Sequence, residues 1–386
     1  MRPSFVEVDL NNLRHNLSLI RGHTENKPVM AVVKANAYGH GMLKVAQLYE
    51  ELGVNCLGVA LLEEGILLRD SGISLPIVVF GGVLPQQIHK YLEWDLEFFV
   101  SSPEVLRVVE TICKSVAEQA TVHLKLDSGM GRLGINTSDS DCFIEEAVKA
   151  EHIKVKGVCS HLACADDPEN PLTMKQVERF LSAVSVFERL GAEIPIRHLS
   201  NSGGVLYFPE THLDLIRPGI LLYGVYPDVT CPHVLDVRPA LQLKSKVTFQ
   251  KSIKTGISVG YGESWTSLSA SEISTVPLGY GDGYMRQLSN RGEVLINGKF
   301  RPIVGRVCMD QFMVNCGNEV TKTGDEVVLI GQQQDQCITI EEISALSFLS
   351  VNNETLKKIL LNSIINGDDE DKIKSIINIS HEKLVE

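Results

Sequence analysis

A lysine that ends an apolar run is the residue of this chain best placed to do covalent chemistry. The run spans residues 28–33, Lys34 follows it, and Tyr38, Gly39 and Gly41 come next. Burial disfavours the charged form of a lysine and lowers its pKa, and a neutral amine can form a Schiff base with a carbonyl compound. The plainer alternative, that Lys34 only marks where a strand leaves the core, fits the same pattern.

Other residues capable of chemistry also follow short apolar runs. They are Asp127 with Arg132, His161, Asn201 with Ser202, and Arg217. Any one of them is an ordinary loop residue when taken alone, but their recurrence indicates that several strands end near one site. Barrel enzymes place their active sites at the carboxyl ends of parallel strands.

The elements that must position these residues alternate between two patterns up to about residue 220. Strand-like apolar runs occupy residues 29–33, 56–59, 77–80, 98–100, 122–126, 155–159, 196–199 and 213–216. Helix-like segments lie between them, for example at residues 42–52, 62–70, 103–117, 141–150 and 172–190. Strands that alternate with helices predict a parallel sheet, and this number of units favours an α/β fold with a (β/α)8 TIM-type barrel. The alternative is an open, doubly wound sheet.

A different pattern begins after Tyr223. Short alternating runs occupy residues 243–248, 273–277, 293–296, 301–307, 311–314 and 325–330, with turn signals such as Asn297-Gly298 between them. This pattern predicts a mostly antiparallel β domain. We therefore expect a barrel over residues 1–235, a β domain over residues 236–350, and a divergent helical and acidic tail over residues 351–386.

The composition argues against several classes of partner. The chain of 386 residues has a formal net charge of −12 and no long basic run, which argues against nucleic acid and against an anionic membrane surface. No signal peptide or bilayer-spanning run is evident. The nine cysteines form no C-x-x-C pair, so we expect reduced thiols in a cytoplasmic protein and no metal site.

The segment around Lys34 also resembles a known motif. Lys34 with Tyr38 is similar to the pyridoxal-phosphate lysine motif of alanine racemases, and residues 1–16 resemble the start of that family. The likeness extends to about residue 345. It implies a pyridoxal 5′-phosphate-dependent isomerase that interconverts L- and D-alanine by a two-base mechanism and supplies D-alanine for peptidoglycan.

The resemblance implies two catalytic bases on opposite faces of the substrate carbon. Lys34 would bind the cofactor and act as one base, and Tyr261 would be the other. Without the resemblance, Tyr261 is typical of a packing residue in a glycine-flanked turn. A free phenol has a pKa of about 10 and needs support at neutral pH, which the family pattern assigns to His161 with Arg217 behind it. The pattern also implies a homodimer with shared active sites, each using Tyr261 of the partner subunit.

Arg217 is the position that bears most directly on the type of reaction. Taken alone, it is typical of an arginine in a salt bridge at a strand end. In the family, the matching arginine faces the pyridine nitrogen of the cofactor. A guanidinium keeps its protons at ordinary pH, so it does not readily protonate the ring, and the ring is a weaker electron sink. This implies racemisation rather than transamination.

Two segments near the last barrel strands are candidates for a phosphate site. Glycines allow close backbone approach, and free backbone amides bind anions. Alone, each segment is also a common turn. The resemblance implies that the phosphate contacts come from the side chains of Ser202 and Tyr38 and from the backbone of Gly219 and Ile220.

Recognition of the substrate carboxylate requires a cation or an amide donor. The resemblance assigns this role to Arg132, in a glycine-rich loop, and to the backbone amide of Met309. Lys125 matches a lysine that is often carbamylated in the family, and a carbamate there would orient Arg132. Tyr280 matches a tyrosine that lines the substrate entrance.

The likeness fails near the end of the chain. Asn353 stands where the family usually carries a tyrosine at the entrance, and the arginine-bearing end is replaced by a segment with an acidic run at residues 368–371. A wider entrance would admit serine beside alanine, so a broader alanine/serine racemase is one alternative. The others are a non-catalytic pyridoxal-phosphate-binding homologue, a basic amino-acid decarboxylase and an aldolase-like barrel.

Overall fold

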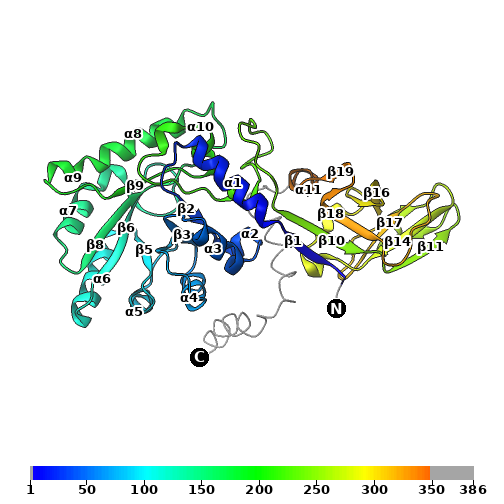
Figure 1. Ribbon diagram of the computed structural model, residues 1–386, viewed down its shortest axis with the longest axis horizontal. Helices are drawn as coiled ribbons and strands as arrows, with labels where there is room; N and C mark the ends of the chain where they lie inside the picture. Colours follow the sequence, from blue (N-terminus) through cyan, green and yellow to red (C-terminus); the bar gives the residue numbers. More distant parts are fainter. Residues whose placement is uncertain (1–2, 348–386) are drawn as a thin grey trace.

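The computed structural model describes residues 3–347, and its first half is a parallel barrel surrounded by helices (Figure 1). Seven strands follow one another in spatial order, and every neighbouring pair is parallel. They are β2 (Met30–Val32), β3 (Cys56–Val59), β4 (Ile77–Val79), β5 (Glu97–Val100), β6 (Ala120–Asp127), β8 (Ile153–Cys159) and β9 (Ile196–His198). A short strand, β7 (Ile135–Asn136), pairs with β6 beside this sheet.

An extended segment around Ile216 closes the barrel between β9 and β2. The Asp214 amide donates to the Arg197 carbonyl on β9, at 3.2 Å. On the other side, the Met30 amide donates to the Ile216 carbonyl at 2.9 Å, and a parallel bridge joins Val29 to Ile216. The predicted barrel is therefore confirmed, and the open sheet is excluded.

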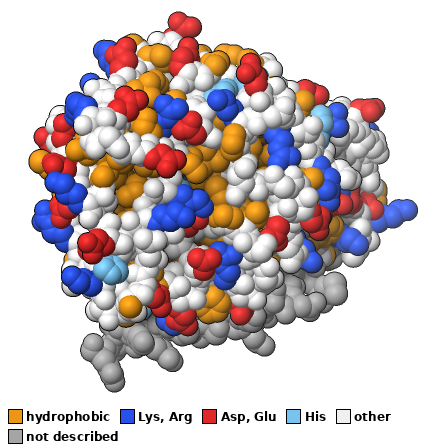
Figure 2. Space-filling view, turned by 60° about the vertical axis from the view of Figure 1, so that its left-hand side comes forward, with side chains coloured by type: hydrophobic (Ala, Val, Ile, Leu, Met, Phe, Trp, Pro, Cys, Tyr) orange, Lys and Arg blue, Asp and Glu red, His pale blue; other side chains and the backbone are white. Residues whose placement is uncertain are grey.

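Amphipathic helices cover the outside of the barrel. In α1 (Leu10–His23), Leu13, Leu17 and Ile20 are buried at helical spacing, and the Asp9 side chain caps the helix by accepting from the Asn11 amide at 2.7 Å. Apart from the short segment α2 (Lys34–Tyr38), the remaining α-helices of this half are α3 (Met42–Glu51), α4 (Leu62–Asp70), α5 (Ile88–Glu93), α6 (Pro103–Val116), α7 (Asp141–Lys149), α8 (Leu172–Val184), α9 (Val186–Arg189) and α10 (Ser202–Tyr207). Figure 2 shows the face of this half that lies at the left of Figure 1, where apolar side chains gather in a hollow among scattered charges.

The second half is an antiparallel β domain, as predicted. Its main sheet has the spatial order β1-β10-β18-β15-β16-β17-β14-β11, and β19 pairs with β18. The bounds are β1 (Phe5–Val8), β10 (Leu241–Lys246), β11 (Phe249–Ile253), β14 (Ser271–Val276), β15 (Glu293–Ile296), β16 (Lys299–Val304), β17 (Phe312–Asn315), β18 (Glu326–Gln333) and β19 (Gln336–Ile338). A small hairpin, β12 (Ser258–Val259) with β13 (Trp265–Thr266), stands apart from it, and α11 (Ile340–Ser347) follows β19.

The first strand of the chain belongs to the sheet of the second half. β1 pairs with β10, with Phe5 opposite Lys244 and Val8 opposite Leu241. The chain therefore starts in the β domain and then enters the barrel through α1. Among the helices of residues 3–347, none has the length and apolar character needed to cross a bilayer.

Candidate active site

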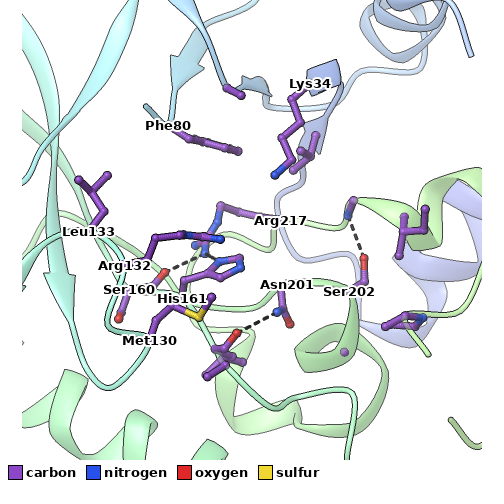
Figure 3. Close-up of a pocket in the computed structure, with 18 of the residues that line it drawn as sticks. Lys34, Phe80, Met130, Arg132, Leu133, Ser160, His161, Asn201, Ser202 and Arg217 are labelled. Atoms are coloured by element: carbon purple, nitrogen blue, oxygen red, sulfur yellow. Dashed lines mark hydrogen bonds between the residues drawn. The ribbon is translucent and has the colours of Figure 1, made fainter. Parts of the chain in front are cut away.

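A cavity of about 450 Å³ lies at the carboxyl ends of the barrel strands. Its lining brings together most of the residues predicted either from the ends of the apolar runs or from the family resemblance (Figure 3). They are Lys34, Tyr38, Lys125, Arg132, His161, Asn201, Ser202, Arg217, Gly219 and Ile220. The convergence has a simple cause, because parallel strands of one barrel all end on the same side.

Lys34 begins a left-handed turn directly after β2. Residues 35–38 all have positive φ angles, between 51° and 55°. L-amino acids adopt this conformation at a cost of about 1–2 kcal/mol per residue, so it persists only where other contacts hold it. The Glu64 carboxylate holds it by accepting from the Ala35 amide at 2.6 Å, and the Asn36 side chain accepts from the Met42 amide at 2.7 Å. The Lys34 side chain then extends into the cavity toward Arg217 (Figure 3).

Arg217 is buried and is held by neutral partners. Its Nη1 donates to Nδ1 of His198 at 3.0 Å, and its Nη2 donates to the Ser160 carbonyl at 2.8 Å. Nη2 also lies 3.4 Å from Nδ1 of His161. Burial lowers the pKa of Arg217, and burial together with the nearby guanidinium lowers the pKa of His161 well below its usual value. No ion pair among residues 3–347 includes Arg217, so the strand-end salt bridge is not formed.

Ser202, Gly219 and Tyr38 form a small cradle at one end of the cavity. The Ser202 hydroxyl accepts from the amides of Gly219 and Leu221, at 3.0 and 3.3 Å. A Cβ on Gly219 would stand 2.5 Å from the Tyr38 hydroxyl, so only glycine allows this approach. Burial, with a contribution from Glu64, raises the pKa of Tyr38, so its hydroxyl stays protonated and can donate.

Lys125 lies on β6, beneath the loop that carries Arg132. It is buried, and its Nζ donates to the Leu126 carbonyl at 2.7 Å. Burial lowers the pKa of Lys125 to about 8. The loop itself is held by the Asp127 carboxylate, which accepts from the amides of three successive residues at 2.8–2.9 Å. Arg132 is exposed at the rim of the cavity.

Three predicted site residues lie in the β domain and do not line this cavity. Tyr261 follows β12 in the turn of the small hairpin and is 71% exposed. Tyr280 and Met309 lie together, because the Gly281 amide donates to the Met309 carbonyl at 2.8 Å, and both are also exposed. Asn353 and the tail lie outside the described residues. A single chain therefore brings Lys34, His161 and Arg217 together but leaves Tyr261 apart.

Two family models match the chain. They are the alanine racemase N-terminal domain, over residues 8–227, and the alanine racemase C-terminal domain, over residues 240–360. The chain belongs to the alanine racemase family. The family membership predicted from the sequence is therefore confirmed.

Relatives in the alanine racemase family match over nearly their whole length. An alanine racemase of Symbiobacterium thermophilum is 41% identical over 348 residues, which cover 90% of this chain and 92% of that protein. The solved alanine racemase of Clostridium difficile 630 has a TM-score of 0.87 at 36% identity and covers 93% of this chain and 94% of its own. A solved histidine racemase of Leuconostoc mesenteroides subsp. sake has a TM-score of 0.82 at 30% identity, with coverages of 92% and 95%.

Some residues of this alanine racemase family site were not found from the sequence. Phe80 and Met130 line the cavity, but apolar residues after a strand carry no signal that separates them from the core. Glu64, which holds the left-handed turn, lies on a helix surface where a glutamate is ordinary. Within residues 3–347, no group of three or more His, Cys, Asp or Glu side chains is arranged to hold a metal ion.

Proposed function

We propose that this chain is a pyridoxal 5′-phosphate-dependent racemase that interconverts L- and D-alanine. The observation that carries the proposal is the convergence of Lys34, Arg217 and the Ser202–Gly219–Tyr38 cradle on one cavity of about 450 Å³. Lys34 supplies an amine that can condense with an aldehyde, and Arg217 supplies a cation that can donate to a ring nitrogen. The cradle supplies hydroxyl and amide groups that can bind a phosphate. Membership of the alanine racemase family supports it.

The residues present fit this cofactor. Gly219 leaves open the space that a Cβ would take beside the Tyr38 hydroxyl, and the buried Ser202 hydroxyl lies in the same cradle, with Ile220 next to it. When bound, the cofactor withdraws electrons from the substrate and makes its α-hydrogen acidic. Arg217 donates hydrogen bonds but keeps its protons, so the withdrawal stays weak and favours return of the proton over transamination.

The hydrogen bonding and lowered pKa of His161 suit it to stabilise a phenolate. A guanidinium only donates, so Nδ1 of His161 accepts from Arg217 and the single proton of the neutral ring is on Nε2. The lowered pKa of His161 keeps this ring neutral at pH 7. An N–H donor next to a phenol oxygen stabilises the phenolate, which enables Tyr261 to take the α-proton on one face while Lys34 serves the other.

Tyr261 has to come from a second copy, because it does not line the cavity of its own chain. We therefore propose a homodimer with shared active sites, in which Tyr280 and the backbone amide of Met309 also reach the partner's cavity. Tyr261, Met309 and Leu268 are 71%, 57% and 94% exposed on the β domain, which is unfavourable for a lone chain in water. Arg132 would bind the substrate carboxylate, oriented by a carbamate on Lys125.

A broader substrate range is the second candidate. It is supported by Asn353 in place of the usual tyrosine and by the likeness to a solved histidine racemase. A panel of L-amino acids, assayed by loss of circular dichroism, separates an alanine-specific racemase from a broader one. Turnover of alanine alone would contradict the broader range. We place the enzyme in the cytoplasm as a source of D-alanine for peptidoglycan, and the nine cysteines are all unpaired as a reducing compartment requires.

The first test is the substitution Tyr261→Phe, followed through exchange of the α-hydrogen with deuterated water. Loss of the phenol should abolish exchange from L-alanine, while exchange from D-alanine through Lys34 persists. Tyr91→Phe is the matched control, because Tyr91 lies on α5 and packs against Phe98, away from the cavity. Undiminished exchange from both enantiomers in Tyr261→Phe would contradict the assigned role.

A further inference from the structure

A chain of hydrogen-bonded side chains runs through the interior of the barrel, away from Arg217. Nε2 of His198 lies 2.8 Å from Nδ1 of His123, and Nε2 of His123 lies 2.9 Å from Oε2 of Glu97. Lys156 donates to the other oxygen of Glu97. His198, His123 and Glu97 are 0%, 2% and 8% exposed, so the chain is shielded from water over most of its length. The proposed reaction uses none of these three residues.

The hydrogen bonds of this chain can point in only one direction. Arg217 has no acceptor, so Nδ1 of His198 must accept from it. The single proton of a neutral His198 is then on Nε2 and is donated to Nδ1 of His123. By the same rule, His123 carries its proton on Nε2 and donates it to Glu97. An ionised carboxylate only accepts, so both ends of the chain specify the same direction.

The surroundings keep both imidazoles neutral. Burial lowers the pKa of His123, although Glu97 opposes the shift, and burial with the nearby Arg217 lowers the pKa of His198 well below its usual value. Burial favours protonation of Glu97, but the bonds from His123 and Lys156 prevail and hold the pKa of its carboxyl below the usual value. Glu97 is therefore charged and the two histidines are not.

The barrel is also shaped around this chain. A Cβ on Gly157 of β8 would stand 2.1 Å from Nδ1 of His123, so a glycine is needed beside the ring. The two imidazoles meet edge to face, with ring centroids 4.9 Å apart. At the far end, Glu97 and Lys156 reach a small cavity of about 290 Å³, which Cys56 and Asp214 also line. The contacts thus come from β3, β5, β6, β8 and β9.

We propose that Glu97 is a positioning residue for Arg217. By accepting from His123, it reinforces from the far end the direction that Arg217 requires, so that His198 presents a lone pair to Nη1 and the guanidinium is held in one orientation toward the cavity. The inference rests on the proposed function in one respect, namely that the group which Arg217 faces is the cofactor ring. The direction of the chain follows from the side chains of the protein and does not depend on the cofactor.

The substitution Glu97→Gln tests the proposal, because an amide has nearly the same shape but can also donate. If the amide NH2 of the glutamine faced His123, Nε2 of His123 would accept and its proton would be on Nδ1. Nε2 of His198 would then accept in turn, and the proton of His198 would be on Nδ1, facing a donor of Arg217. Nitrogen NMR of ¹⁵N-histidine-labelled holoenzyme, without substrate, reports which ring nitrogen carries the proton. We expect single Nε2–H forms of His123 and His198 in the wild type, and a mixture or the other form in Glu97→Gln.

Activity is the second readout. Loosened positioning of Arg217 should lower kcat for alanine by roughly tenfold or more, with KM changed less than kcat. Glu110→Gln is the matched control, since Glu110 on α6 accepts from Nδ1 of His152 at 2.9 Å on the outside of the barrel. It should leave kcat and the signals of His123 and His198 unchanged.

Gly157→Ala is the independent variant, because its methyl group displaces His123 without changing any charge. If Glu97→Gln does not fold, the His198 signals and kcat of Gly157→Ala test the proposal instead. Wild-type NMR showing His198 protonated on Nδ1 would overturn the proposal, as would unchanged His198 signals or an unchanged kcat in the substituted protein. If the wild type shows the one-way chain but does not racemise alanine with added cofactor, the proposed function fails and the direction of the chain stands.

Discussion

Lys34 and Lys125 line the same cavity but are prepared for different chemistry. Lys34 stands at the tip of a left-handed turn and extends into the open space. Lys125 is buried on β6, and its Nζ donates to the Leu126 carbonyl. With a pKa of about 8, Lys125 has a larger neutral fraction near pH 7 than an ordinary lysine, while its charged form is still the majority. A neutral amine adds CO2, and the product is an anion beside Arg132.

Carbon NMR with ¹³C-bicarbonate tests the proposed carbamate on Lys125 directly. We expect one protein carbamate signal that is absent in Lys125→Met. Carbamate formation consumes neutral amine and releases a proton, so at fixed total bicarbonate the signal should fall as the pH drops from about 8 to 6. Lys27→Met is a control that should keep the signal, since Lys27 donates to the Leu213 carbonyl elsewhere in the barrel. A signal that survives in Lys125→Met would refute the assignment.

At the scale of the elements, the cradle depends on how the segment after Ile216 passes the left-handed turn after β2. Gly219 belongs to the first segment and Tyr38 to the second, and they meet because Ile216 closes the barrel against Met30. Neither segment forms the cradle without this closure. The proposed phosphate site is therefore a consequence of the barrel being complete.

Gly219→Ala should weaken cofactor binding at least tenfold, because its Cβ would stand 2.5 Å from the Tyr38 hydroxyl and force it aside. The apparent Kd follows from titration of the protein with pyridoxal phosphate, read by absorbance. Gly22→Ala is the control, since a Cβ there meets nothing within 4 Å. An unchanged Kd in Gly219→Ala, with thermal unfolding like that of the wild type, would remove Gly219 from the cradle.

The sequence was most informative where one local rule sufficed. Lys34, His161, Ser202 and Arg217 were found because each follows an apolar run and parallel strands end together. Asn297-Gly298 was predicted as a turn because Asn and Gly tolerate positive φ. In the hairpin of β15 and β16, both residues do have positive φ, at 55° and 73°.

Contacts across several strands could not be predicted in this way. The link from Glu97 to His123 and His198 depends on the register of β5, β6 and β9, which no single segment encodes. One partial signal existed, because His123 and Lys125 are two residues apart in the run 122–126, whose other residues are apolar, and so share one face of the strand. The pairing of β1 with β10 was also missed, since more than 230 residues of chain separate them.

At the scale of the whole molecule, the two halves are joined by several fixed contacts. The Asn16 side chain on α1 donates to the Arg238 carbonyl at 2.8 Å and accepts from the Arg238 amide at 2.7 Å, shortly before β10 begins. The Asp9 amide donates to the Ala240 carbonyl at 2.8 Å, next to the pairing of β1 with β10. These bonds hold the start of β10 against β1 and α1, and Tyr261 lies in the β domain, outside the lining of its own chain's cavity.

Mixing two inactive variants tests whether Tyr261 acts across a dimer. Lys34→Ala and Tyr261→Phe each lack one base, so each should be inactive in racemisation when pure. In a mixed dimer with shared sites, one cavity has lost both bases, while the other combines Lys34 of one chain with Tyr261 of its partner. Equal amounts that exchange freely should recover about one quarter of wild-type activity. Tyr91→Phe mixed with Lys34→Ala controls for dilution, and recovery of no activity after confirmed subunit exchange would place both bases within one chain or remove Tyr261 from the reaction.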